Sequence, residues 1–223
     1  MTRSRPLFFL LVFFYLGFLS TPVSARGKAP RSVVHITSRL LVPTYHYQYS
    51  TAQIQAMSGI QAPSRAAEEP GLTIFEYELT SKYEMEVNGS SPGGPFWVWA
   101  KSLQASFITR RMDVYVSSQY PRGTCQFRAI MNHENNHVAI NKRVFRKYLK
   151  LLNRRLKTTV SIPTQARPLR AASELEGENM LDARIKPLVT KLEEQFGAEI
   201  KRENAKIDTP ESYRRVQAQC RGW

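Results

Sequence analysis

The sequence predicts an α+β fold, in which an antiparallel or mixed sheet from the N-terminal half packs on a long helix and on further C-terminal helices. Between Phe75 and Val87, apolar or aromatic side chains hold most odd positions, and polar side chains hold the even ones. This period of two is typical of a strand that buries one face. Between Thr124 and Leu156, apolar residues recur every three or four positions, which is typical of an amphipathic helix.

The first 25 residues have the order of segments found in a secretory signal peptide. Arg3 and Arg5 form a short positive region, an apolar run follows over 7–19, and Val23–Ala25 offers small residues for a signal peptidase. The apolar run is shorter than the roughly 20 residues of a stable membrane span. We therefore expect cleavage near Ala25 and export to the periplasm or beyond, with an uncleaved anchor as the alternative.

The rest of the chain divides into an N-terminal segment over 26–44, flexible or strand-containing, and one domain over 45–223. Glycine, serine and proline separate the elements predicted in the first half of the chain. Besides the strand over 75–87, these elements are strands over 33–42, 45–49, 96–109 and 112–117, and a helix from Ser50 or Thr51 to Ile60. A loop is expected around Pro163 and Pro168.

Capping residues indicate where the later helices begin. Thr124 precedes the long helix and is a suitable N-cap. Ser173 and Glu176 form the pattern of a capping box, and Pro187 is expected to kink or restart the helix that follows. Thr209-Pro210 predicts a short terminal helix, because proline fits the first helical position.

Cys125 and Cys220 are the only cysteines in the chain. In an exported protein an even number of cysteines favours a disulfide, and two free thiols are the alternative. A bond between them would close a loop long enough to stabilise the fold by about 4 to 5 kcal/mol.

The chain is strongly basic, with 32 lysine and arginine residues against 18 acidic ones and a formal net charge of +14. This charge favours anionic partners such as acidic phospholipid, lipopolysaccharide or wall polymers. Nucleic acid is not expected, because the motifs that read bases are absent. A cationic face of the long helix would suit an anionic envelope surface, with an ordinary solvated face as the alternative. Its residues are Lys142, Arg143, Arg146, Lys147, Lys150, Arg154 and Arg155.

The five residues from His133 to His137 carry the chemistry that the sequence predicts. Histidines four positions apart lie on one face of a helix, so that both imidazoles can reach one ion. Glu134 is rotated from them by one residue and places a carboxylate beside that ion. This is the HExxH pattern of zinc peptidases, and the alternative is a pair of histidines that bind no metal. His35 and His46 lie among predicted strand residues and are expected to be structural.

The chain resembles a secreted bacterial family of uncharacterised function, described as zinc-dependent proteases of minimal zincin type. The resemblance lies in Tyr120–Cys125, in the HExxH helix that follows, and in Ile207–Pro210, and it extends over roughly residues 45–220. It implies a zincin-like fold, with a sheet packed on the active-site helix, and a zinc ion ligated by His133 and His137. The third histidine of metzincins and the downstream glutamate of thermolysin-like enzymes are absent at their usual spacing.

Asp208 is the leading candidate for the third zinc ligand. It lies twelve residues before Cys220, and His137 lies twelve residues after Cys125. If the disulfide forms and the two helices run antiparallel with equal rise, Asp208 comes level with His137. An ordinary capping role is the alternative for Asp208. Two acids of the preceding helical region are rival ligands: Glu174 and Glu178.

Three protein ligands would leave a fourth position for water, whose pKa zinc lowers to about 7. Glu134 would act as general base when this zinc-activated water attacks a carbonyl, and would then protonate the leaving amine. The oxyanion needs a further donor, for which Tyr213 is the candidate, with a packing role as the alternative. The sequence thus predicts an exported zinc metallopeptidase acting on a peptide or protein substrate. The alternatives are a zinc amidase acting on cell-wall peptides and a non-catalytic basic protein that binds the envelope.

Overall fold

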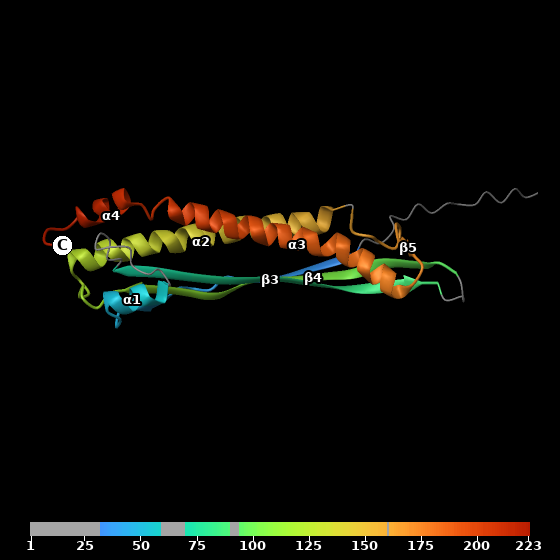
Figure 1. Cartoon of the computed structure of the whole chain (residues 1–223), viewed down its shortest axis with the longest axis horizontal. Helices are drawn as coiled ribbons and strands as arrows, with labels where there is room; N and C mark the ends of the chain where they lie inside the picture. The colour runs from blue at the N-terminus through green and yellow to red at the C-terminus, as the bar shows by residue number, and fades with distance from the viewer. Residues whose placement is uncertain (1–31, 59–69, 90–93, 160) are drawn as a thin grey trace, which may run out of the picture.

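A long antiparallel hairpin of β3 (Gly71–Asn88) and β4 (Phe96–Val116) extends along most of the molecule (Figure 1). The structure is a computed structural model that describes residues 32–58, 70–89, 94–159 and 161–223. Within these residues it has five strands and four helices, which confirms the α+β class. The predicted signal peptide, over 1–25, lies outside the described residues.

Strand β4 is the centre of the sheet, since each of the other strands in the described part of the chain pairs with it. Strand β3 occupies one edge of β4. Along its other edge, β1 (Val33–Arg39) and β2 (Thr44–His46) pair with β4 in parallel, and β5 (Leu169–Ala171) pairs with its first residues in antiparallel fashion.

The structure corrects the prediction of two strands over 96–109 and 112–117, because these residues belong to the single strand β4. Arg110 and its neighbouring arginine interrupt the apolar pattern there and suggested a break. The register of the hairpin shifts between Glu76 and Tyr77, where β4 has one residue more than β3. Arg110 is the extra residue of this bulge and is exposed, so the strand continues on both sides of it.

Two further strand predictions and one loop prediction need correction. The strand predicted over 33–42 ends at Arg39, and the one predicted over 45–49 ends at His46. The loop expected around Pro163 and Pro168 leads into β5. The sheet is therefore not confined to the N-terminal half of the chain.

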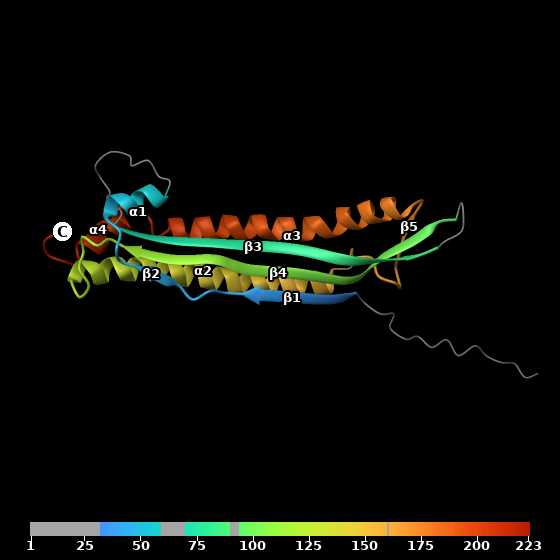
Figure 2. The ribbon, with the colours of Figure 1, turned by 90° about the horizontal axis from the view of Figure 1, so that it is seen from below.

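Two long helices lie side by side on one face of the sheet, as Figures 1 and 2 show. They are α2 (Cys125–Thr158), of 34 residues, and α3 (Glu174–Ala205), of 32 residues. The short helix α1 (Thr51–Ser58) packs against β3, and α4 (Pro210–Gln217) packs against α2. The N-terminal part of α2 and the whole of α4 therefore meet at one end of the molecule (Figure 1).

The predicted N-caps are confirmed. In each case a hydroxyl oxygen accepts a hydrogen bond from the backbone N–H three residues later, which satisfies a donor that the helix leaves unpaired. The pairs are Thr124 with Phe127, Ser173 with Glu176 and Thr209 with Ser212.

Two details of α3 differ from the prediction. The carboxylate of Glu176 accepts from the backbone N–H of Ala172, one residue before the position that a capping box requires. Pro187 lies inside α3, and the helix continues on both sides of it.

The core lies between the sheet and the two long helices, and its centre is aromatic. Phe107 of β4, Phe145 of α2 and Phe196 of α3 are each at most 1% exposed. The ring of Phe107 lies 4.2 Å from that of Phe145 and 5.1 Å from that of Phe196, centroid to centroid. Tyr77 and Tyr148 meet Phe196 edge-on at 4.5 and 5.4 Å. Phe196 thus joins the sheet to both helices.

The variant Phe196→Ala is expected to lower the free energy of unfolding by about 3 to 5 kcal/mol, because it removes a buried ring and leaves a cavity. Urea unfolding followed by circular dichroism measures this loss. The control is Trp97→Ala, which removes an aromatic side chain of β4 that is 41% exposed, and it should cost less than about 1 kcal/mol. Similar losses in the two variants would contradict the central position of Phe196.

Candidate metal centre

His133 and His137 lie one turn apart on the buried face of α2, as the HExxH pattern predicts. They are 7% and 8% exposed, and their Nε2 atoms lie 3.3 Å from each other. The same face of α2 continues into the core through Val138, Val144 and Phe145. The packing that stabilises the helix therefore also fixes the direction in which both imidazoles point.

Asp208 meets both histidines. Its Oδ1 lies 2.9 Å from Nε2 of His137 and 3.3 Å from Nε2 of His133. One ligand atom from each of the three residues lies within 4.8 Å of the others. Two imidazole nitrogens and one carboxylate oxygen are a donor set that suits zinc, so this group, the metal-ligand triad, could hold a metal ion.

The route by which Asp208 reaches the histidines differs in one respect from the prediction. The predicted disulfide between Cys125 and Cys220 is present, with the two Cα atoms 5.7 Å apart. Asp208 itself lies outside any helix, in the connection between α3 and α4. The assumption of equal rise along two helices therefore does not hold, although the disulfide does hold the chain end that contains Asp208 against α2.

Asn204 fixes the orientation of His137. The amide nitrogen of Asn204 donates to the backbone carbonyl of Ile200 at 3.0 Å and to Oδ1 of Asn141 at 2.8 Å. Its Oδ1 therefore faces His137 and accepts from Nδ1 at 2.8 Å. With the hydrogen on Nδ1, the neutral ring presents the lone pair of Nε2 towards Asp208, as a metal ligand requires.

Charge compensation within the triad marks the position for a cation. Burial acts to raise the pKa of Asp208, but hydrogen bonds from His133 and His137 outweigh it and hold the pKa well below its usual range. Burial acts to lower the pKa of His137, but Asp208, Glu134 and Asn204 outweigh it and raise the pKa. Asp208 and His137 thus stabilise opposite charges on each other, and a divalent cation at this position would supply the positive charge that Asp208 favours.

Glu134 is buried beside the triad, under the start of β3. Its side chain is 4% exposed, and Thr73 donates to its Oε2 at 2.8 Å. A Cβ atom at Gly71 would lie only 2.5 Å from Oε1 of Glu134 and 2.8 Å from Cγ2 of Ile130, so a larger residue there would displace the carboxylate from its present position. Burial raises the pKa of Glu134, although the charges of His137 and His133 and the hydrogen bond of Thr73 oppose the shift. A carboxylate in this setting binds a proton more readily than one in water.

Sequence reasoning missed Gly71, Thr73 and Asn204. A signal for two of them existed, because extending the two-residue period of β3 back from Phe75 places Thr73 and Gly71 on the face that meets the helices. For Asn204 no pattern was present, since one asparagine near the end of a helix has no characteristic spacing.

Tyr213 of α4 completes the polar contacts of Asp208. Its hydroxyl donates to Oδ1 of Asp208 at 3.3 Å, and its ring lies 5.2 Å from that of His133, centroid to centroid. The predicted oxyanion donor is thus held at the triad by the first turn of the terminal helix.

The other candidate residues lie elsewhere. Glu174 and Glu178 belong to the first turns of α3, at the end of the molecule away from α4 (Figure 1). His46 lies 3.4 Å from Asp113 and stacks on Tyr115 at 4.6 Å, away from the triad. His35 is exposed on β1. None of these four belongs to the metal-ligand triad.

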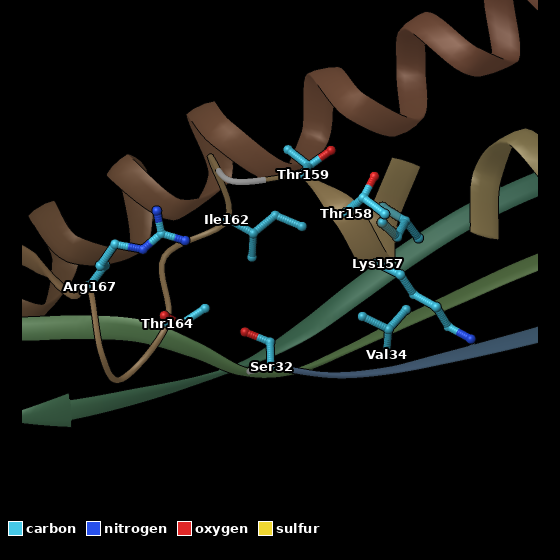
Figure 3. A pocket seen from close by; sticks show the side chains of 9 residues that line it. Ser32, Val34, Lys157, Thr158, Thr159, Ile162, Thr164 and Arg167 are labelled. Carbon is cyan, nitrogen blue, oxygen red and sulfur yellow. The ribbon is translucent and has the colours of Figure 1, made fainter. Parts of the chain in front are cut away.

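A cavity of about 470 Å³ lies at the C-terminal end of α2 (Figure 3). Its described lining combines apolar side chains such as Val34 and Ile162, four hydroxyl groups, and the cations Lys157 and Arg167. It includes no histidine, cysteine or carboxylate side chain. This cavity therefore offers neither ligands for zinc nor a general base.

Comparison of the chain with family models, with curated proteins and with solved structures finds no match. Within the described residues, no helix is long and apolar enough to cross a membrane. The function of the site therefore has to be argued from its geometry and chemistry.

The variant Asn204→Ala is expected to weaken zinc binding about 10- to 100-fold, because His137 loses the acceptor that fixes its ring. Competition with a chromophoric chelator measures the dissociation constant. The control is Asn153→Ala, the same change at an exposed position of α2, which should leave zinc affinity within about twofold. Unchanged affinity in Asn204→Ala would show that the amide does not orient a ligand.

Proposed function

We propose that the chain is an exported zinc-dependent metallopeptidase of zincin type, in which His133, His137 and Asp208 hold the zinc ion and Glu134 is the general base. One observation carries this proposal. Two buried imidazoles and the exposed carboxylate of Asp208 form a donor set beside a separate carboxylate, that of Glu134, which is buried. In a purely structural cluster, charged side chains pair with one another. Glu134 is instead a separate carboxylate with a raised pKa, which is typical of a proton acceptor.

Zinc, when bound, would supply Lewis acidity to the attacking water and to the substrate carbonyl. Glu134 takes the proton of that water and returns it to the leaving amine. Thr73 holds the Glu134 carboxylate in position by a hydrogen bond, and Gly71 leaves the space that the carboxylate occupies. Tyr213, whose hydroxyl donates to Asp208 in this structure, would redirect that hydrogen to the oxyanion that develops on the carbonyl oxygen.

The same residues would serve an amidase that acts on cell-wall peptides, because both reactions add water to an amide carbonyl. The two activities differ in the groups that surround the amide and not in the metal centre. Export is the second part of the proposal, supported by the signal-like N-terminal sequence and by the disulfide.

The purified mature chain is expected to contain about one zinc ion per chain, and His133→Ala to contain almost none. Glu134→Gln should keep the zinc and lose peptidase activity by a factor of about 100 or more, because only the proton acceptor is removed. Elemental analysis and hydrolysis of a peptide library measure these outcomes. A wild-type chain that binds no zinc after reconstitution would refute the assignment of the chain as a zinc enzyme. Activity that survives in Glu134→Gln would refute the assignment of Glu134 as general base.

A non-catalytic role at an anionic envelope surface is the second candidate, and the charges of α2 favour it. Three of its seven cations are engaged with α3: Arg143 with Glu203, Lys147 with Glu199, and Arg155 with the backbone carbonyl of Leu188. The other four form no ion pair with any residue that the structure describes, and we call them the free basic stripe. They recur at every fourth position: Lys142, Arg146, Lys150 and Arg154.

Replacing all four cations of the free basic stripe by glutamate is expected to weaken binding to vesicles containing phosphatidylglycerol by a factor of ten or more, since each cation near such a surface contributes about 1 kcal/mol. Sedimentation with vesicles measures the binding, which should also fall as salt rises. An equal change of charge at Lys82, Arg184, Lys191 and Lys201, which lie on β3 and α3, is the control. Equal loss in both variants would show that net charge alone attracts the protein.

A further inference from the structure

A cavity of about 300 Å³ adjoins the metal-ligand triad and shares His133 with it. It lies where the N-terminal half of α2 faces α4 and the connection before α4. Besides His133, the polar residues of its described lining are Asn132, Asn136, Lys206, Ser212, Arg215 and Gln219. A group that enters this cavity therefore comes next to His133, a zinc ligand of the proposed site.

The polar lining of this cavity is suited to an anion. Three side-chain amides and one hydroxyl can donate hydrogen bonds, and two cations add positive charge. None of the described lining residues has a carboxylate. The lining is thus positively charged, whereas the adjacent site contains the carboxylates of Asp208 and Glu134. A positively charged lining favours binding of a carboxylate over an ammonium group.

Arg215 is the cation with the freedom to bind such a group. Its guanidinium lies 3.8 Å from Glu211, and both side chains are more than 70% exposed, so this pair is weak. Lys206, by contrast, is held by Glu203 at 2.6 Å. A guanidinium also presents two parallel N–H donors that match the two oxygens of a carboxylate.

We infer that the substrate is a peptide with a carboxylate next to the scissile bond, bound in this cavity with Arg215 as the specificity-determining residue. The inference rests on the proposed peptidase function and adds the substrate class. The carboxylate has two sources with the same chemistry, an acidic side chain or the free C-terminus of the peptide. The positive net charge acts in the same direction, because it attracts anionic peptides to the protein; it is +14 for the full chain and +12 without Arg3 and Arg5 of the predicted signal peptide.

The test uses quenched fluorescent peptides that differ only in the residue beside the cleaved bond, which is Glu, Gln or Lys. A second series places a free or an amidated C-terminus at that position. For the zinc-loaded chain, kcat/KM is expected to be at least about tenfold higher for Glu than for Gln and lowest for Lys. A preference for the free over the amidated C-terminus would identify the C-terminal carboxylate as the source.

Arg215→Glu should abolish or reverse the preference for Glu. Arg214→Glu is the matched control, since it makes the same change of charge on the same helix at a residue outside the described lining. The same peptides are also titrated by fluorescence anisotropy into the Glu134→Gln variant, so that binding is measured without cleavage. There the Glu peptide should bind about tenfold more tightly than the Gln peptide, and the additional Arg215→Glu change should remove the difference.

The outcomes separate this inference from the proposed function. Equal kcat/KM and equal binding for the Glu and Gln peptides, or equal losses in Arg215→Glu and Arg214→Glu, would overturn the assignment of the cavity. Cleavage of peptides without such a preference would leave the peptidase in place. Binding that depends on Arg215, with no peptide cleaved, would support the cavity and refute the peptidase.

Discussion

The packing of α2 against the β3–β4 hairpin is the interaction on which the rest of the structure depends. One face of this helix supplies Val144, Phe145 and Leu152 to the core and, two to three turns earlier, the two histidines of the candidate metal centre. His133 and His137 lie on one face of α2, so a rotation of the helix about its axis would turn both histidines away from Asp208 together. Apolar burial over a helix of about 50 Å therefore sets the geometry of a polar site near one end of it.

The buried polar groups of the site impose a second constraint, because each charge that leaves water needs a partner. The structure meets this need in two separate groups: His133, His137 and Asp208 with Asn204, and Glu134 with Thr73. A lost partner leaves a buried polar group unsatisfied, which costs more than the bond itself contributed. The site is thus specified by its supporting residues as much as by its ligands.

Local signals in the sequence were sufficient for the helices and for two members of the site. Hydrophobic periodicity and hydroxyl caps each depend on residues a few positions apart, and Thr124 and Ser173 start their helices as predicted. His133 and His137 are likewise four positions apart. Asp208 was reached through the disulfide, because a covalent link is a long-range constraint that can be read from the cysteine count.

Features that depend on contacts between distant segments could not be predicted. The continuity of β4 through Arg110 depends on a bulge opposite β3, which only the pairing reveals. The two-residue period places Gly71 and Thr73 on the inner face of β3, but not against Glu134, which lies about sixty positions later in the chain. Asn204 meets His137 across two helices. These residues have ordinary local surroundings, and their roles come from what the fold places beside them.

The disulfide joins α2 to the chain end that follows α4, and Asp208 lies just before that helix. If the triad binds zinc as proposed, metal binding and the oxidation state of the cysteines are thermodynamically coupled. Because the bond keeps Asp208 close to the histidines, zinc would bind the oxidised chain more tightly than the reduced one. Reciprocity then requires that bound zinc make the disulfide harder to reduce by the same factor.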